Sequence, residues 1–82
     1  MRMRVRLFAI LRQRAGVEEA EIDLAEGATV AEARREILVR WPVLADLLGK
    51  AAIAVNREYA KDDRRLAEGD EVALLPAVSG GM

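Results

Sequence analysis

The stretch MRVRLFAIL, residues 3–11, decides the fold of this chain. Every second residue in it is apolar, and Arg4 and Arg6 fill alternate positions. Successive side chains of a β-strand point to opposite faces, so this period of two predicts a strand with one face against a core. The same strand places Phe8 and Ile10 on the other face, beyond the two arginines.

A second strand follows. Gly16 marks a turn, and Ala20, Ile22 and Leu24 then alternate with acidic residues. This pattern predicts a strand antiparallel to the first.

The charges of these two segments are sorted. Residues 1–16 contain five Arg and no acid, whereas residues 17–28 contain five acids and no base. One interpretation is a basic patch for an anionic partner, and the other is a hairpin that pairs opposite charges across its ladder. The net charge of -1 gives little electrostatic steering and favours the hairpin.

A helix is predicted next. Thr29 and Glu32 have the spacing of a capping box, and Pro42 stops the helix because it has no N–H to donate. A short helical turn through residues 47–48 ends at Gly49. The apolar face of the main helix comprises Val30, Ala33, Ile37, Leu38 and Trp41.

The remaining elements are a strand over residues 52–56, a short edge strand within 59–66 and a last strand over 72–75. A right-handed crossover through the helix places the first and last strands side by side and parallel. We therefore predict an α+β fold of the ubiquitin-like β-grasp type, with a mixed sheet of four to five strands and one main helix on one face. The domain covers residues 1–76, and residues 77–82 form a flexible tail. The predicted core comprises Val5, Leu7, Ile22, Leu24, Ile53, Val55, Val72 and Leu74.

The composition excludes most catalytic sites. The chain has no Cys and no His, so it has no cysteine nucleophile and lacks the commonest general base. Ser79 is the only Ser and has no base beside it. Asp62 and Asp63 are too few for a hard-cation site, which needs six or more oxygens, and we expect no bound metal. The balanced charge argues against nucleic acid, and no apolar run spans a bilayer. We expect a cytoplasmic protein that is not an enzyme by itself.

Two features remain. The tail ends in Ser79, Gly80 and Gly81 before Met82. Glycine has no β-carbon, so such an end fits a narrow channel and leaves a terminal glycine carboxylate unhindered. It could be threaded into a partner's active site, or it could be an ordinary frayed end.

The second feature is apolar. Four apolar residues share the face of the predicted sheet that points away from the helix: Phe8, Ile10, Ala73 and Leu75. Such a cluster is either a partner surface or is covered by the connections of residues 40–65.

Several short motifs occur together in this chain. They are LFA at residues 7–9 with Leu11, Arg12 and Gly16, AVN at 54–56, LAEGDEVA at 66–73, Leu75-Pro76, and VSGG at 78–81. In this combination the chain resembles the small subunit of molybdopterin synthase, a ubiquitin-like sulfur carrier of the MoaD type. The resemblance covers essentially the whole chain.

The resemblance implies how such a carrier works. A ubiquitin-activating-like adenylyltransferase would use ATP to adenylate the Gly81 carboxylate, and a sulfur donor would convert the adenylate to a thiocarboxylate. The tail, including Val78, Ser79 and Gly80, would enter the large synthase subunit in a heterotetramer and give sulfur to a cyclic pyranopterin precursor. Phe8, Ile10, Leu75 and Pro76 would contact that subunit. The carrier itself would bind no cofactor.

The sequence departs from this family at two positions. Pro76-Ala77 stands where the family often has two prolines, and Met82 follows the glycine that should be last. With Met82 attached, Gly81 has no free carboxylate: either a protease removes Met82, or Met82 is an addition to the natural chain, or the chain is an inactive copy. The alternatives are a sulfur carrier for thiamine or tRNA thiolation, a ubiquitin-like protein modifier, and a plain interaction module.

Overall fold

The computed structural model describes residues 1–77, so the predicted tail lies outside the described residues apart from Ala77. None of the helices in this part of the chain has the length and apolar character that a membrane crossing needs. In chain order the elements are β1 (Arg2–Leu7), α1 (Ala9–Ala15), β2 (Glu19–Asp23), α2 (Val30–Arg40), the 3-10 turn η1 (Pro42–Leu44), α3 (Ala45–Leu48), β3 (Ala52–Val55), β4 (Glu58–Tyr59) and β5 (Glu71–Leu75).

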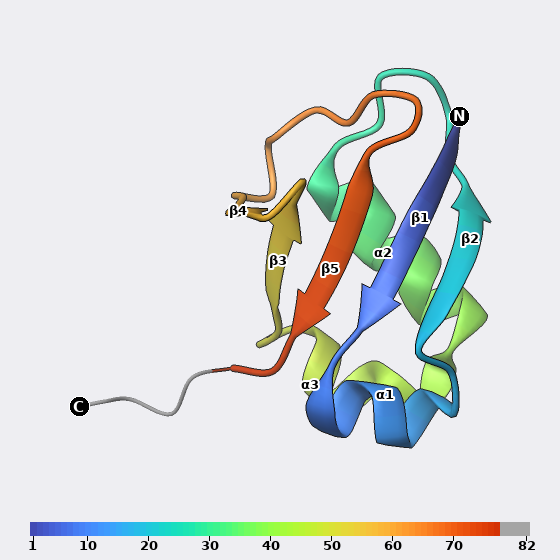
Figure 1. Cartoon of the computed structure of the whole chain (residues 1–82), viewed down its shortest axis with the longest axis vertical. Coiled ribbons are helices and arrows are strands. Elements are labelled where there is room, and N and C mark those ends of the chain that lie inside the picture. Colours follow the sequence, from blue (N-terminus) through green and yellow to red (C-terminus); the bar gives the residue numbers. More distant parts are fainter. Residues whose placement is uncertain (78–82) are drawn as a thin grey trace.

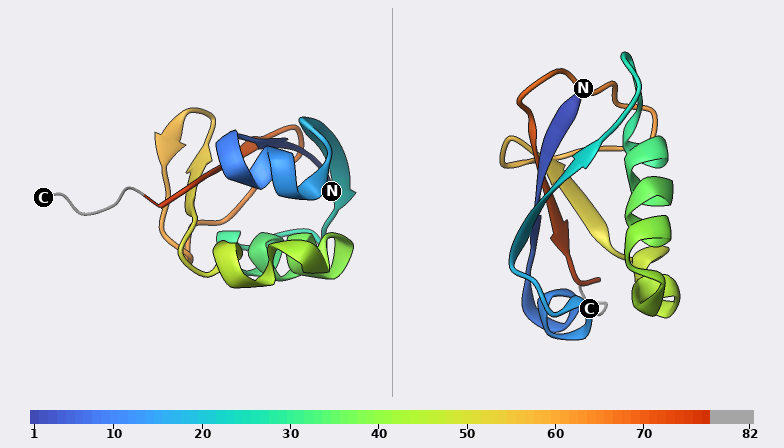
Figure 2. Two further views of the ribbon diagram at one scale, coloured as in Figure 1. Left: turned by 90° about the horizontal axis from the view of Figure 1, so that it is seen from below. Right: turned by 90° about the vertical axis from the view of Figure 1, so that its right-hand side faces the viewer.

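The strands form one five-stranded sheet in the order β2-β1-β5-β3-β4 (Figure 1). β1 runs antiparallel to β2 and parallel to β5, so the first and last strands are adjacent as predicted. β3 pairs antiparallel with both β5 and β4. The mixed sheet with α2 packed on one face confirms the β-grasp prediction (Figure 2).

The start of α2 is fixed by the predicted capping box. The Thr29 hydroxyl accepts a hydrogen bond from the Glu32 amide at 3.4 Å, and the Glu32 carboxylate accepts one from the Thr29 amide at 3.0 Å. Both amides belong to the helix start, where no carbonyl of the helix is available to them. The cap thus sets the residue at which α2 begins to cross the sheet.

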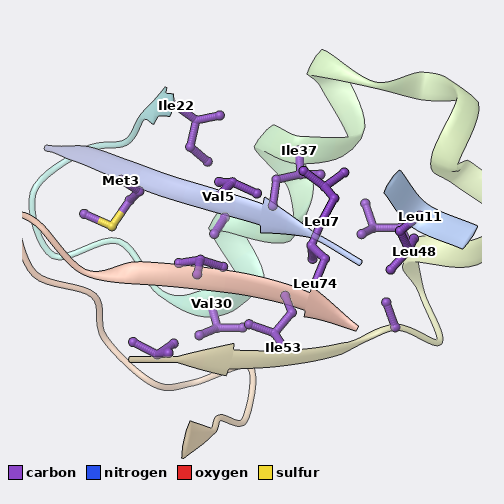
Figure 3. Packing of buried hydrophobic residues seen from close by; sticks show 14 of the residues in the cluster. Met3, Val5, Leu7, Leu11, Ile22, Val30, Ile37, Leu48, Ile53 and Leu74 are labelled. Carbon is purple, nitrogen blue, oxygen red and sulfur yellow. The ribbon is translucent and has the colours of Figure 1, made fainter. Parts of the chain in front are cut away.

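The core lies between the sheet and α2 (Figure 3). Seven of the eight predicted core residues are buried. Leu24 is the exception, because it lies one residue beyond β2 and is only partly buried. Leu38 was also predicted to face the core, but its side chain is 38% exposed. It follows the fully buried Ile37, and a step of one residue turns a helix by about 100°.

The prediction of a strand through residue 11 is wrong. β1 ends at Leu7, and helix α1 begins at Ala9. Ala9 has φ 53°, a left-handed value that turns the chain out of the sheet. Leu11 still reaches the core because it is a buried residue of that helix, and Gly16 ends the helix with φ 80°.

The sorted charges pair across the β1–β2 hairpin, as the second interpretation predicted. The Arg2 side chain lies 3.7 Å from the Glu21 carboxylate, and Arg4 lies 3.2 Å from Glu19. These side chains are at least half exposed, so each pair adds at most about 1 kcal/mol. The opposite charges support the pairing of the two strands and leave no separate basic patch on this hairpin.

Candidate functional site

The proposed reactive end lies outside the described residues. This applies to Gly81, to Val78, Ser79 and Gly80 before it, and to Met82 after it. The structure places the surface from which the tail departs, at the end of β5.

β5 carries two different faces. Val72 and Leu74 are buried under α2, whereas Ala73 and Leu75 are half-buried on the opposite face of the sheet. β1 continues this arrangement by one residue, since the Phe8 amide donates to the Leu74 carbonyl at 3.2 Å. Phe8 and Leu75 therefore meet on the face that no helix covers.

These side chains line a shallow hollow of about 310 Å³, which we call the open-face groove. It comprises Arg6, Phe8, Ala54, Arg57, Tyr59, Glu71, Ala73 and Leu75. Phe8 and Leu75 are half-buried, and Tyr59 at one side is 75% exposed. The connection between residues 40 and 65 forms a wall of the groove and leaves it open. Phe8 and Leu75 are thus partly exposed in the free chain, and the connection does not cover them as the second alternative supposed.

The charged residues of the groove are two arginines and one glutamate. The Arg6 guanidinium lies over the Phe8 ring, 5.3 Å from its centroid, and 3.9 Å from the Glu71 carboxylate. Arg57 takes part in none of the ion pairs among residues 1–77. The groove is thus an apolar floor with a net positive rim.

Ile10 does not belong to this groove. Because the chain enters α1 at Ala9, Ile10 lies in a separate hollow of about 270 Å³, the tail-side groove. Pro76 and Ala77 border the same hollow, together with Leu47 and Lys50. The structure therefore divides the four predicted contact residues into two neighbouring pairs, Phe8 with Leu75 and Ile10 with Pro76.

Of the adjacent acids Asp62 and Asp63, Asp62 has a structural partner. Asp62 accepts a hydrogen bond from Arg34 at 3.1 Å, and the same guanidinium donates to the Leu48 and Ala51 carbonyls. Among residues 1–77, no three His, Cys, Asp or Glu side chains come together as metal ligands would. Asp62 thus helps to hold the loop before β3 against α2.

Sequence reasoning missed four residues of the open-face groove: Ala54, Arg57, Tyr59 and Glu71. Ala54 and Tyr59 are paired in the β3–β4 ladder, so they share a face. The sequence predicted a strand that ends at Asn56, but the position of this segment beside Phe8 follows only from the strand order of the sheet.

The comparisons with known proteins agree with this fold. Residues 5–81 match the ThiS family, and the chain belongs to that family. Several curated relatives of the chain carry the name molybdopterin synthase sulfur carrier subunit. The protein of that name from Chlamydomonas reinhardtii is 36% identical over 83 residues, which cover 99% of this chain and 100% of the relative.

Two solved structures are also similar. The crystal structure of SAMP1, the small archaeal modifier protein 1, from Haloferax volcanii has 32% identity and a TM-score of 0.87. The complex of subunits 1 and 2 of the molybdopterin-converting factor from Helicobacter pylori 26695 gives 32% identity and a TM-score of 0.71. Each match covers 99% of this chain and 100% of the other.

Proposed function

We propose that this chain is the sulfur carrier subunit of a molybdopterin synthase and is not catalytic alone. Its family and its named relatives support this role. The observation that carries the proposal is the open-face groove beside β5, the strand that leads directly to the Gly-Gly end. A partner that holds this groove would have the carrier's last residues within its reach.

The chemistry takes place at the carboxylate of Gly81 after the loss of Met82. A carboxylate oxygen attacks the α-phosphorus of ATP in the activating adenylyltransferase, and pyrophosphate leaves. Sulfur from a donor then attacks the acyl carbon and displaces AMP, which leaves a thiocarboxylate. The activating enzyme binds the ATP, so the carrier needs no cofactor and no catalytic side chain of its own.

We propose the large synthase subunit as the partner on the open-face groove, in a heterotetramer. The similar Helicobacter pylori protein forms a complex of subunits 1 and 2. Once docked, the thiocarboxylate would donate sulfur to a cyclic pyranopterin precursor, and two donations would complete the dithiolene. Phe8 and Leu75 would be the apolar contacts, and Ile10 and Pro76 would contact the subunit beside the tail.

Mass spectrometry tests the reactive atom. The full chain, a chain ending at Gly81 and a chain ending at Gly80 are each incubated with the activating enzyme, ATP and a sulfide donor. We expect the exchange of one oxygen for sulfur only in the form that ends at Gly81. Equal exchange in the full chain without trimming would show that the free Gly81 carboxylate is not required.

A second candidate is a protein modifier, because SAMP1 is as similar in structure as any relative described above. A modifier and a sulfur carrier share the activation step and differ in the acceptor. Addition of lysine-containing proteins to the activated chain distinguishes them. Isopeptide-linked products would favour the modifier, whereas sulfur transfer to the pterin precursor would favour the carrier.

A further inference from the structure

The β3–β4 hairpin has an unusual residue in its turn. Val55 pairs with Glu58, so Asn56 and Arg57 are the two loop residues. Their φ angles are 51° and 73°, and two positive values in succession are the signature of a type I′ turn. Glycine is strongly preferred at the second position because a β-carbon is crowded there. Arg57 therefore holds a strained conformation.

Asn56, the first loop residue, also has a positive φ, but it adopts this conformation at a lower cost than Arg57. Asparagine tolerates the left-handed region well. The Asn56 side chain also accepts a hydrogen bond from the Glu71 amide at 3.0 Å and donates one to the Asp70 carboxylate at 2.9 Å. Asn56 thus ties the turn to the start of β5. Arg57 is exposed, and it takes part in none of the ion pairs among residues 1–77.

The turn places Arg57 at the open-face groove. Arg57 and Tyr59 both line the open-face groove. Glu58 pairs with the buried Val55 and so lies on the other face of the hairpin. Within the groove, Arg6 already lies against Phe8 and Glu71. Arg57 is the cation that remains without a counter-charge beside the apolar floor.

We propose that Arg57 is a specificity-determining residue, which pairs with a carboxylate of the large synthase subunit when that subunit covers the open-face groove. This inference rests on the proposed function. An anionic side chain at the edge of an apolar contact meets the net positive charge of the rim. A partner surface that carries positive charge is repelled by this rim, and the repulsion contributes to partner selection.

Three full-length variants test the proposal. Arg57→Gln removes the charge and keeps the strained backbone. Arg57→Gly removes both the charge and the strain. Arg35→Gln is the control, since it removes an exposed charge from α2, which lies on the other side of the sheet. Affinity for the large subunit is measured by calorimetry at low and at moderate salt, and the melting temperature of each free chain is recorded.

We expect Arg57→Gln and Arg57→Gly to bind about three- to tenfold more weakly at low salt and to depend less on salt. Arg57→Gly should also melt about 2–5 °C higher than the unaltered chain, because the turn strain is relieved. Arg35→Gln should bind as the unaltered chain does. A variant that folds better and binds worse would identify Arg57 as a residue kept for recognition.

Two results would overturn the inference. If Arg57→Gln binds the large subunit with unchanged affinity and salt dependence, Arg57 is not a determinant, even if activation by the adenylyltransferase falls. If the unaltered chain does not bind the large subunit at all, the proposed function fails and this inference fails with it. The behaviour of the unaltered chain therefore separates the two failures.

Discussion

Val5 and Val72 lie directly opposite each other on the parallel strands β1 and β5, and neither side chain is exposed. Both belong to the hydrophobic cluster beneath α2. Their contact joins the first strand of the chain to the last, across a separation of more than sixty residues in the sequence. This pair therefore connects the β1–β2 hairpin to the rest of the sheet.

Truncation at this contact should be costly. We expect Val72→Ala to lower the free energy of unfolding by about 2 kcal/mol, because it removes buried methyl groups and leaves a cavity. Val39→Ala is the matched control, since Val39 on α2 is 72% exposed, and it should change stability by no more than about 0.5 kcal/mol. Urea unfolding measures both. Equal losses would contradict the assignment of Val72 to the core.

The capping box gives a second prediction. Thr29→Ala removes the oxygen that accepts from the Glu32 amide and should cost about 1 kcal/mol of stability. Glu32→Gln keeps an acceptor for the Thr29 amide and should cost clearly less. Thermal unfolding of the two variants tests this order. If Glu32→Gln proves the more damaging, charge rather than the hydrogen bond stabilises the helix start.

The open-face groove should tolerate charge in the free chain but not in the complex. We expect Phe8→Asp or Leu75→Asp to weaken binding of the large subunit by at least about 2 kcal/mol, as for an interface hot spot. The melting temperature should remain nearly unchanged, since both side chains are only half-buried. Leu38→Asp on α2 is the control with normal binding. Unfolding of the Phe8 and Leu75 variants would instead make them core residues.

The turn from β1 into α1 stores strain that can be released. Ala9 has φ 53°, so Ala9→Gly should raise stability by about 0.5–1 kcal/mol. Ala45 is also an exposed alanine at a helix start, but its φ is -54°. Ala45→Gly should therefore lower stability by a similar amount. Opposite signs in chemical denaturation are the expected result, and the same sign for both would refute the strain at Ala9.

The missed helix shows where pattern reasoning failed. Apolar residues and arginines alternate only over residues 3–7, because residues 7–11 are all apolar, and Leu7 and Leu11 fit a helical spacing of four as well as a strand. Nothing in the sequence marks the start of α1, because its N-cap is Phe8, which makes no side-chain capping bond. α2 was predicted correctly because Thr29 and Glu32 mark its start.

The candidate site was predictable in part. Alternation along β1 and β5 was sufficient to place Phe8 and Leu75 on the open face. Tyr59 and Arg57 reach the groove through the pairing of β3 with β5, a contact between distant segments that local patterns do not encode. Ile10 was misplaced for a local reason. The prediction continued the strand through Ala9, and this continuation would point the Ile10 side chain to the open-face groove instead of the tail-side groove.

The central position of β5 affects synthesis of the protein. β5 is the last strand to leave the ribosome, yet it lies between β1 and β3 and joins the two hairpins into one sheet (Figure 1). A chain that terminates before Glu71 would lack both this strand and the terminal glycines. It could not assemble the surface by which a partner is held. Products that end before β5 therefore cannot compete with the complete chain for a partner.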